Sequence, residues 1–387
     1  MFKVKLMNKI AKVGTDVLSP TRYQIGEDIE NEDAIMVRSA ALHETPFSPN
    51  LRAIARCGAG VNNIPVEKCT EQGIEVFNTP GANANAVKEL AIAALILASR
   101  DVIGGVKWVQ TLVGQENVAK QVEKGKAAFV GHELAGKTLG VIGLGAIGGM
   151  VANAAISLGM SVMGYDPYIT AKAAWSLAPS VKQAADYAEI FKTCDYITLH
   201  VPATPQTKNM ICKDTLAQMK EGVRILNLAR ADLVNATDLK KALKEKKVAT
   251  YVTDFPTDET AGVEGIIAIP HLGASTIESE DHCAIMAAQQ LDEFLTCGNI
   301  RNSVNFPSVG LPHSEKPRVC IMNKNVPNML TQITSAFSAQ NINIENLANG
   351  SKGEIAYTIV ETNVPIGADI LQKLTEIDGI FGVRAFA

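Results

Sequence analysis

The amino-acid sequence predicts an α/β protein with a doubly wound parallel sheet, followed by a smaller α+β module at the C-terminal end. Short buried strands alternate with helical stretches over about the first 300 residues, a pattern typical of parallel sheets with helices on both faces. A glycine-rich turn joins a strand to a helix at residues 143–148. About 70 residues at the end follow a different pattern.

The composition excludes several classes of function. The chain has 387 residues, which at roughly 150 residues per domain corresponds to two or three domains. Its net charge of −4 disfavours nucleic acid, whose phosphates require a dense basic face. The longest apolar run, residues 90–98, is too short to span a membrane. Seven scattered cysteines without a C-x-x-C pair argue against disulfides and metal sites, so we expect a cytoplasmic protein without a metal.

The first hundred residues predict strands of a parallel sheet at 34–38, 51–55 and 74–77. The last of these strands closes on a turn at 78–81. From residue 86 we expect one helix that runs to about residue 109 and is long enough to cross into a second domain.

A strand at 138–142, the glycine turn and a helix at 149–158 form the clearest unit. A second strand, 161–165, ends in Asp166. Further strands are predicted at 196–201, 224–228, 249–253 and 265–269. This alternation predicts a Rossmann-type sheet, after which a helix at 277–297 returns to the first domain.

The composition changes at residues 305–317, where three prolines, two serines and a glycine indicate a linker. Beyond it we expect strands at 318–323, 342–349, 355–362 and 383–386, with helices at 329–340 and 368–377. This pattern predicts a separate ferredoxin-like module.

The glycine turn predicts a dinucleotide site. Gly143 and Gly145 allow the backbone to approach a pyrophosphate, and Gly148 lets the helix pack on the strand. The turn also contains Ala146 and Ile147. Asp166 would accept hydrogen bonds from ribose hydroxyls and repel a 2′-phosphate, so NAD is favoured over NADP. The alternative is a glycine turn that binds no ligand.

An arginine, a carboxylate and a histidine follow three downstream strands and suit the oxidation of a 2-hydroxy acid. Arg230 can hold the substrate carboxylate in a bidentate pair. His271 can accept the hydroxyl proton as hydride leaves C2, with an acidic residue from 254–259 as its partner. Taken singly, each of these residues could instead serve packing or a surface salt bridge.

The motifs together resemble a D-2-hydroxyacid dehydrogenase. They are Val37-Arg38-Ser39, the segment 56–63, the segment 78–83, the glycine turn with Asp166, Leu199-His200-Val201-Pro202, Asn227 to Arg230 and Pro270 to Thr276. Within this family, the chain is most similar to members that oxidise 3-phospho-D-glycerate to 3-phosphohydroxypyruvate, the first step of serine biosynthesis. The resemblance implies that NAD also contacts Val201, Pro202, Leu228, Ala229, Asp254 and Gly273.

The same resemblance implies the domain plan. A flavodoxin-like substrate domain is expected at 1–99 and 273–303, with an NAD-binding domain inserted at 100–272, a linker at 304–316 and an ACT-like regulatory domain at 317–387.

The acidic partner of His271 stays open at this point. The family usually has Asp-Val-Phe-x-x-Glu-Pro, whereas this chain has Asp254-Phe255-Pro256-Thr257-Asp258-Glu259. Alignment on the phenylalanine places Asp258 in the acidic position, and counting from Asp254 places Glu259 there.

Substrate and effector residues are also implied by the resemblance. Arg38 and Arg56 would meet the substrate phosphate, although each could be a solvated surface charge, and Asn83 would lie against the carboxylate. In the ACT-like module, Asn325 and Asn343 would hold L-serine between subunits of a homo-oligomer, with Asn323 where serine-sensing enzymes carry histidine. Asn328 replaces the usual glycine, which is tolerable because asparagine visits the left-handed region. A purely oligomerising module is the alternative.

Two other functions remain open from the sequence. One is a glyoxylate or hydroxypyruvate reductase of the same family. The other is a non-catalytic, NAD-sensing binding protein that keeps the fold.

Overall fold

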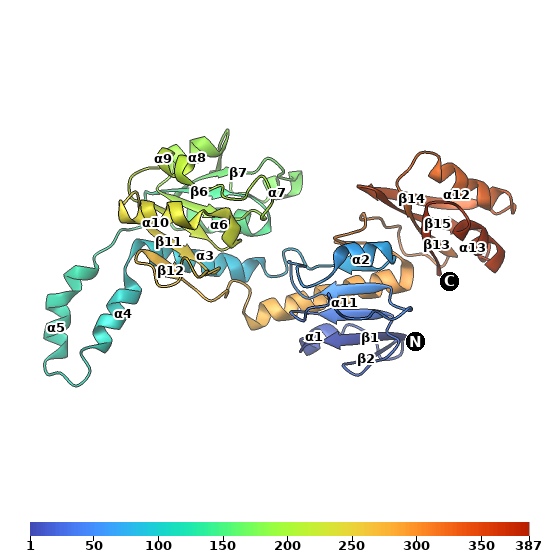
Figure 1. Cartoon of the computed structure of the whole chain (residues 1–387), viewed down its shortest axis with the longest axis horizontal. Coiled ribbons are helices and arrows are strands. Elements are labelled where there is room, and N and C mark those ends of the chain that lie inside the picture. Colours follow the sequence, from blue (N-terminus) through green and yellow to red (C-terminus); the bar gives the residue numbers. More distant parts are fainter. Residues whose placement is uncertain (387) are drawn as a thin grey trace. The chain divides into compact units, whose positions relative to one another are not determined.

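The computed structural model describes residues 1–386, which form two compact units (Figure 1). The first unit contains residues 1–83 and the chain from residue 277 onward, and the second contains residues 84–276. Strands assemble into three sheets, two in the first unit and one in the second. Among residues 1–386, no helix is both long and apolar enough to cross a membrane.

A five-stranded parallel sheet begins the first unit. Its strands are β1 (Phe2–Met7), β2 (Tyr23–Gly26), β3 (Ala34–Val37), β4 (Ala53–Arg56) and β5 (Glu75–Phe77), in the order β2-β1-β3-β4-β5. This is the flavodoxin-like order, as expected. The three predicted strands are confirmed to within two residues at each end, whereas β1 and β2 were not predicted.

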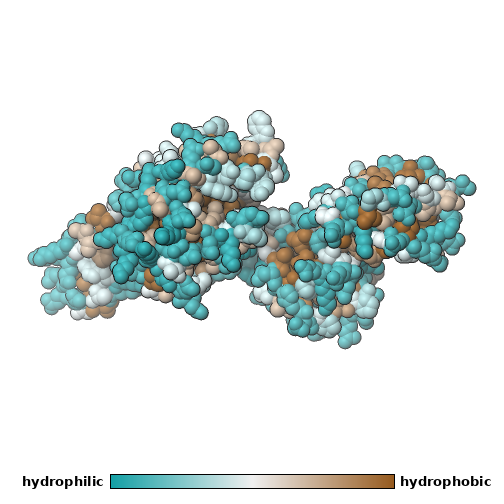
Figure 2. Space-filling view, turned by 45° about the horizontal axis from the view of Figure 1, so that its top comes forward, coloured by the Kyte–Doolittle hydropathy of each residue, from teal (hydrophilic) through white to brown (hydrophobic). Residues whose placement is uncertain are grey.

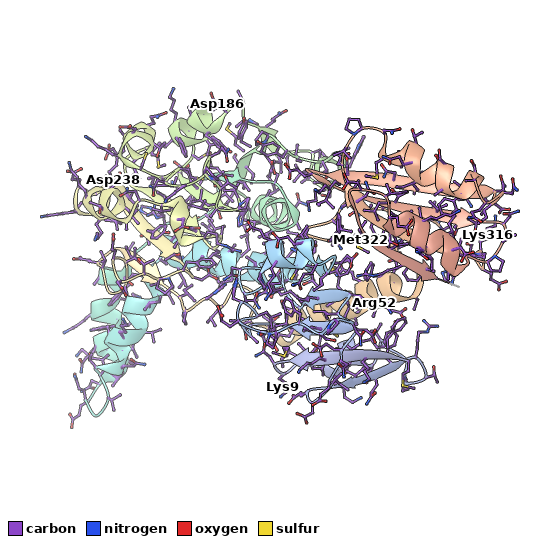
Figure 3. All side chains as sticks on the ribbon, turned by 45° about the vertical axis from the view of Figure 1, so that its right-hand side comes forward. Lys9, Arg52, Asp186, Asp238, Lys316 and Met322 are labelled. Atoms are coloured by element: carbon purple, nitrogen blue, oxygen red, sulfur yellow. The ribbon has the colours of Figure 1, made fainter. Side chains whose placement is uncertain are left out.

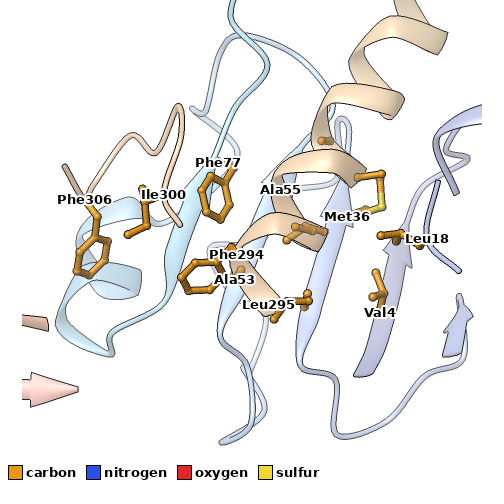
Figure 4. Close-up of a cluster of buried hydrophobic side chains, with 14 of the residues drawn as sticks. Val4, Leu18, Met36, Ala53, Ala55, Phe77, Phe294, Leu295, Ile300 and Phe306 are labelled. Carbon is orange, nitrogen blue, oxygen red and sulfur yellow. The ribbon is translucent and has the colours of Figure 1, made fainter. Parts of the chain in front are cut away.

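Helices cover both faces of this sheet. The helices α1 (Lys12–Thr15) and α11 (Ile277–Cys297) pack on one face, and α2 (Val66–Glu71) packs beside β5. Figure 4 shows α11 across the sheet, with Phe294 and Leu295 directed at side chains such as Phe77 and Met36. The predicted helix at 277–297 is therefore confirmed, and it closes a core that begins at Val4.

The second unit contains a seven-stranded parallel sheet. Its strands are β6 (Thr138–Ile142), β7 (Ser161–Tyr165), β8 (Lys182–Gln183), β9 (Tyr196–Leu199), β10 (Val223–Asn227), β11 (Val248–Thr253) and β12 (Ile266–Ala268), in the order β12-β11-β10-β9-β6-β7-β8. Two separate buried clusters cover its faces, so the predicted doubly wound sheet is confirmed.

The helices of this sheet lie on opposite sides. On one side are α3 (Ala84–Ser99) and α6 (Ala146–Ser157), and on the other are α8 (Tyr187–Thr193), α9 (Lys213–Gln218) and α10 (Ala236–Lys244). The short helix α7 (Ala171–Trp175) follows β7. Helices thus connect the strands of this sheet from β6 to β11, as parallel strands require, and a loop without a helix connects β11 to β12.

A helical arm projects from the second unit and consists of α4 (Val102–Gln110), α5 (Val118–Gly125) and the turn η1 (Lys126–Phe129) (Figure 1). The expectation of one helix over 86–109 is wrong, because the chain turns between α3 and α4. Asp101 caps α4 by accepting a hydrogen bond from the Gly104 N–H at 2.8 Å. An aspartate that satisfies free N–H groups starts a new helix rather than continuing the old one.

The C-terminal module is an antiparallel four-stranded sheet with two helices on one face. It contains β13 (Arg318–Lys324), α12 (Met329–Ser338), β14 (Ile344–Lys352), β15 (Ile355–Thr362), α13 (Ala368–Thr375) and β16 (Ile380–Phe386), in the strand order β14-β15-β13-β16. The predicted β-α-β-β-α-β order is confirmed. Asn328 has a φ of 68°, the left-handed conformation that was expected there.

The other face of the C-terminal sheet packs on the first unit's parallel sheet. Strand β13 alternates between two cores, with Val319 and Ile321 facing the module's helices and Cys320 and Met322 facing the parallel sheet. Met322 is labelled in Figure 3. The Tyr357 hydroxyl donates a hydrogen bond to the Gly298 carbonyl at 2.7 Å. Strands β13 and β15 are therefore buried on both faces, whereas most of β14 is exposed.

The connector before β13 is also partly buried. Asn305 and Phe306 are 8% and 0% exposed, although their segment has the composition of a linker. Asn305 accepts a hydrogen bond from the Val76 N–H at 2.9 Å, and its amide donates to the Ile74 carbonyl. The connector is thus held against β5 rather than exposed along its whole length.

Candidate active site

The candidate site lies at the carboxyl edge of the seven-stranded sheet. Strands β6, β7, β9, β10, β11 and β12 are parallel, so the residues that follow them share one edge. Ligands of doubly wound sheets bind at this edge.

The glycine turn after β6 has the geometry of a phosphate-binding cradle. Gly143 has a φ of 90°, and a Cβ atom there would lie 2.5 Å from the carbonyl oxygen of His200. A Cβ on Gly148 would lie 1.9 Å from the Gly143 carbonyl oxygen. Gly145 has open space where a side chain would begin. The turn therefore excludes side chains and leaves room for a ligand above Gly145.

Helix α6 begins directly after Gly145, so Ala146 and Ile147 form its first turn and their N–H groups supply partial positive charge. Asp166 lies at the end of β7. Its carboxylate accepts hydrogen bonds from the N–H groups of Leu144 and Tyr168, each at 2.9 Å. Asp166 is therefore fixed beside the glycine turn, where an acidic residue can meet a ribose.

Asp254, which follows β11, is the most buried acidic residue at this edge, with 1% exposure. Its Oδ2 accepts a hydrogen bond from the Gly273 N–H at 3.1 Å, whereas Oδ1 is buried without a partner among the described residues. Burial raises the pKa of this carboxyl. An unpaired buried oxygen is costly unless a ligand donates to it, and the carboxamide of a nicotinamide is such a donor. These residues fit NAD.

Four other predicted cofactor residues also follow strands at this edge. Val201 lies against the position where Gly143 would carry a Cβ, and Pro202 comes next in the chain. Leu228 is buried and Ala229 is half-buried. Sequence reasoning included Asn227 in a motif but gave it no role; it is fully buried, and its amide donates to the Arg230 carbonyl at 2.7 Å. A polar residue at the end of an otherwise apolar strand was the available signal.

In the structure, Arg230 and His271 both lie beside the aromatic ring of Phe255. The Arg230 guanidinium carbon is 5.6 Å from the centroid of the Phe255 ring, and the His271 ring centroid is 4.5 Å from it. Both side chains are exposed. The backbone N–H of His271 donates a hydrogen bond to the Asp254 carbonyl at 2.9 Å, which holds the loop that carries the histidine against the end of β11.

Asp258 and Glu259 both lie on an exposed turn after β11. The Glu259 Oε2 atom is 3.9 Å from the Lys240 Nζ atom. Within residues 1–386, the ring that packs against the His271 imidazole is that of Phe255. The acidic partner of His271 therefore stays a prediction, with both candidates still open.

The predicted substrate residues lie in the first unit. Arg38 follows β3 and pairs with Glu280 of α11 at 2.6 Å, and the Arg56 Nε donates to the Arg38 carbonyl at 3.1 Å. Asn83 is half-buried in the loop before α3. In that loop, the Asn78 carbonyl accepts a hydrogen bond from the Gln290 amide of α11 at 3.1 Å. The two arginines are thus neighbours.

The predicted effector residues lie in the C-terminal module. The Asn325 amide donates to the Gly353 carbonyl, whereas the Asn343 N–H donates to the Asn363 side chain. Asn323 is 2% exposed, with its Oδ1 buried and unpartnered among the described residues.

Comparisons with known proteins agree with this geometry. Residues 93–273 match the family model described as the NAD binding domain of D-isomer specific 2-hydroxyacid dehydrogenases. A D-3-phosphoglycerate dehydrogenase of Haemophilus influenzae is 32% identical over 352 residues, which cover 87% of this chain and 82% of that protein. One from Methanocaldococcus jannaschii is 34% identical over 315 residues, or 79% of this chain. This chain spans only 58% of the M. jannaschii protein.

Solved structures include the crystal structure of a 3-phosphoglycerate dehydrogenase of Entamoeba histolytica with bound NAD+. It is 27% identical to this chain, with a TM-score of 0.62, and the match covers 79% of this chain and 98% of that one. An NAD-binding domain is therefore present at residues 93–273.

Proposed function

Because the chain belongs to the D-isomer specific 2-hydroxyacid dehydrogenase family, we propose that it oxidises 3-phospho-D-glycerate to 3-phosphohydroxypyruvate with NAD. The observation that carries this proposal is the arrangement of Arg230, Asp254 and His271 at one sheet edge beside the glycine turn. The names of similar proteins from H. influenzae and M. jannaschii support it.

In this proposal, different residues of the second unit bind the substrate and accept its proton. NAD supplies the acceptor for the hydride that leaves C2 of the substrate. Arg230 binds the substrate carboxylate, and His271 takes the proton of the 2-hydroxyl group, so that a 2-oxo acid, NADH and one proton result. Either Asp258 or Glu259 would orient the imidazole once substrate is bound.

We assign the substrate phosphate to Arg38 and Arg56 of the first unit. Arg38 follows β3 and Arg56 is the last residue of the neighbouring strand β4, and the Arg56 Nε donates a hydrogen bond to the Arg38 carbonyl. Two guanidinium groups suit a phosphate dianion. Asn83 would meet the substrate carboxylate.

The decisive experiment follows NADH formation from 3-phosphoglycerate. We expect turnover by the intact chain, and a loss of roughly 100-fold or more in kcat for His271→Gln, since general-base catalysis contributes about that much. His313→Gln, a change at another exposed histidine, is the matched control and should leave kcat unchanged. Equal kcat values for the two variants would remove His271 from the mechanism.

Substrate comparison separates the family alternatives. A 3-phosphoglycerate dehydrogenase should lose most of its kcat/KM on D-glycerate, and Arg56→Ala should abolish the difference between the two substrates. Faster turnover of glyoxylate or hydroxypyruvate, unaffected by Arg56→Ala, would favour the reductase function. Tight NADH binding without turnover of any 2-hydroxy acid would favour a non-catalytic binding protein.

We propose that the protein is a homo-oligomer. None of the residues of α4, α5 and η1 is buried, and Val106 of α4 is 54% exposed. Val113, in the loop between α4 and α5, and Val130, directly after η1, are 84% and 81% exposed. Figure 2 shows hydrophobic surface among the hydrophilic residues there. Exposed apolar side chains concentrated on a projecting element suit a second copy of the chain.

We also propose L-serine as an effector that is bound by two copies of the C-terminal module. Asn325 lies beside the start of β15 and Asn343 beside its end, because Lys324 pairs with Ile355 and Ile344 pairs with Thr362. Eight residues of strand separate them by roughly 25 Å, too far for one small amino acid. A shared site therefore needs Asn325 from one chain and Asn343 from another.

We place the activity in the cytoplasm. The support is that the seven cysteines are scattered along the sequence without a C-x-x-C pair, a pattern that suits a reducing compartment.

A further inference from the structure

We propose that Phe255 is a positioning residue, whose ring holds Arg230 and His271 in their reactive arrangement. This inference rests on the proposed function, because it assumes that these two side chains act on a 2-hydroxy acid. Its basis is that one aromatic side chain contacts both of them.

Local backbone geometry fixes where the ring stands. Phe255 follows the buried Asp254 and precedes Pro256, and a residue before proline is held in an extended conformation. The Phe255 N–H donates to the Thr253 hydroxyl at 3.0 Å. The ring is therefore delivered to the carboxyl edge of β11 by a stiff segment.

The two functional side chains have few other restraints. Arg230 is exposed, and its Nη1 donates to the Ala229 carbonyl at 2.6 Å. His271 is also exposed and has a φ of 42°, so its loop is held in a conformation that non-glycine residues rarely adopt. A long arginine and an imidazole at a solvent edge would otherwise sample several rotamers.

The ring acts on both groups by electrostatics and by contact. The face of an aromatic ring is negative, so it attracts the Arg230 guanidinium at 5.6 Å. The His271 ring is tilted by 44° at 4.5 Å, a favourable aromatic arrangement. When His271 accepts the substrate proton it becomes a second cation, and a cation near the Phe255 ring is attracted by the negative ring face.

The acidic side chains nearby do not replace this contact. Glu259 lies toward Lys240, and the carboxylate of Asp254 accepts from the Gly273 N–H. Within residues 1–386, Phe255 is the side chain whose ring packs on the imidazole. Its loss should leave the fold intact but disperse the two functional groups.

The first experiment compares Phe255→Leu with Phe255→Tyr in the full-length protein. Leucine keeps apolar contact but has no π face, so we expect kcat on 3-phosphoglycerate to fall roughly 10- to 100-fold, with the KM for NAD within about twofold of the original. Tyrosine should restore kcat to within about threefold. The two variants thus show whether an aromatic ring, rather than any apolar side chain, is required at this position.

A matched control is Phe47→Leu in the first unit, which removes another half-buried ring that lies 5.1 Å from a cation, Lys68. It should leave kcat unchanged. A Phe255→Leu enzyme with kcat within about twofold of the original, or a Phe255→Tyr enzyme as slow as Phe255→Leu, would overturn the inference.

A second measurement does not depend on activity. In protein with isotope-labelled histidine, the C–H resonances of His271, assigned with His271→Gln, should be shifted by the Phe255 ring. The shift should disappear in Phe255→Leu and persist in Phe255→Tyr. Unchanged resonances in Phe255→Leu would overturn the inference even in an active enzyme. A protein with the ring shift but no turnover of 2-hydroxy acids would overturn the proposed function alone.

Discussion

At the scale of single residues, Glu280 forms an ion pair with Arg38, one of the two arginines to which the proposed function assigns the substrate phosphate. Its carboxylate lies 2.6 Å from Arg38, and both side chains are about two-fifths exposed. A substrate phosphate would have to displace this carboxylate. Glu280 therefore competes with the substrate for Arg38.

Replacement of Glu280 by glutamine should lower the KM for 3-phosphoglycerate. An exposed ion pair contributes up to about 1 kcal/mol, which corresponds to a change in KM of up to roughly fivefold. The KM for D-glycerate should stay the same, because it has no phosphate. Glu278→Gln, on the same helical turn, is the control, and a raised KM in Glu280→Gln would contradict the competition.

The site residues that the sequence predicted are those with local signals. Gly143, Gly148 and Asp166 stand at set distances from a strand and a helix, so their places follow from the pattern. The contact of Phe255 with Arg230 and His271 joins three loops. It depends on how far each of three parallel strands extends, which residue spacing does not contain.

At the scale of elements, the arm should act as the contact between copies of the chain. Val106→Glu places a carboxylate among the exposed valines of α4, so it should dissociate the oligomer, as light scattering with size-exclusion chromatography would measure. Lys107→Glu places the same group at the next position and should leave the mass unchanged. Equal masses for the original protein and Val106→Glu would place the contact elsewhere.

Most elements were predictable because helices and strands differ in the spacing of their apolar residues. Strand β13 and the strands of the seven-stranded sheet are apolar runs of strand length, and α11 is confirmed at both ends. The break between α3 and α4 was missed because apolar residues resume directly after the polar residues Ser99, Arg100 and Asp101, so the two helices were read as one. The capping bond between Asp101 and Gly104 outweighs that apolar pattern locally.

At the scale of the whole molecule, a buried ion pair joins the C-terminal module to β5. Arg384 of β16 lies 2.9 Å from the Oε2 atom of Glu75 and also donates to the Gly73 carbonyl at 2.7 Å. Glu75 is fully buried, and its Oε1 has no partner among the described residues. Burial raises the pKa of Glu75 to about 7, against the opposing effect of Arg384.

This pair predicts how stability changes with pH. Since the folded protein holds the Glu75 proton more tightly, the contribution of this group is complete below about pH 4.5 and is lost as the pH rises through about 7. Glu75→Gln imitates the protonated group. The free energy of unfolding should be measured with urea at pH 5 and pH 8 for both proteins. Between these pH values, the stability of Glu75→Gln relative to the original protein should increase by on the order of 3 kcal/mol. If the relative stability of Glu75→Gln instead decreased from pH 5 to pH 8, attraction of the Glu75 carboxylate to Arg384 would dominate over burial.

Serine binding tests the assembly. Calorimetry should detect L-serine with the intact chain, and both Asn325→Ala and Asn343→Ala should abolish the signal. A mixture of these two variants should regain sites where complementary chains meet, because each site takes one residue from each copy. Binding that survives either single change would exclude that residue from the site, and no serine binding by the intact chain would leave the module with a purely oligomerising role.

The docking of the C-terminal module was beyond sequence reasoning. Residues 305–317 have the composition of a tether, yet Phe306 is fully buried in the core that Met322 and Tyr357 also enter. Composition indicates the intrinsic conformational preference of a segment, but not its contacts with the rest of the protein. Burial at Phe306 depends on a complementary surface supplied by β5 and β15.

The order in which the first unit's parts leave the ribosome has a consequence for its folding in the cell. Strands β1 to β5 are complete by residue 77, but α11, which covers them, begins only at residue 277. At about 5–20 residues per second, the nascent sheet waits roughly 10–40 s with that face uncovered. We therefore expect it to engage chaperones during translation, while the intervening 84–276 segment folds first.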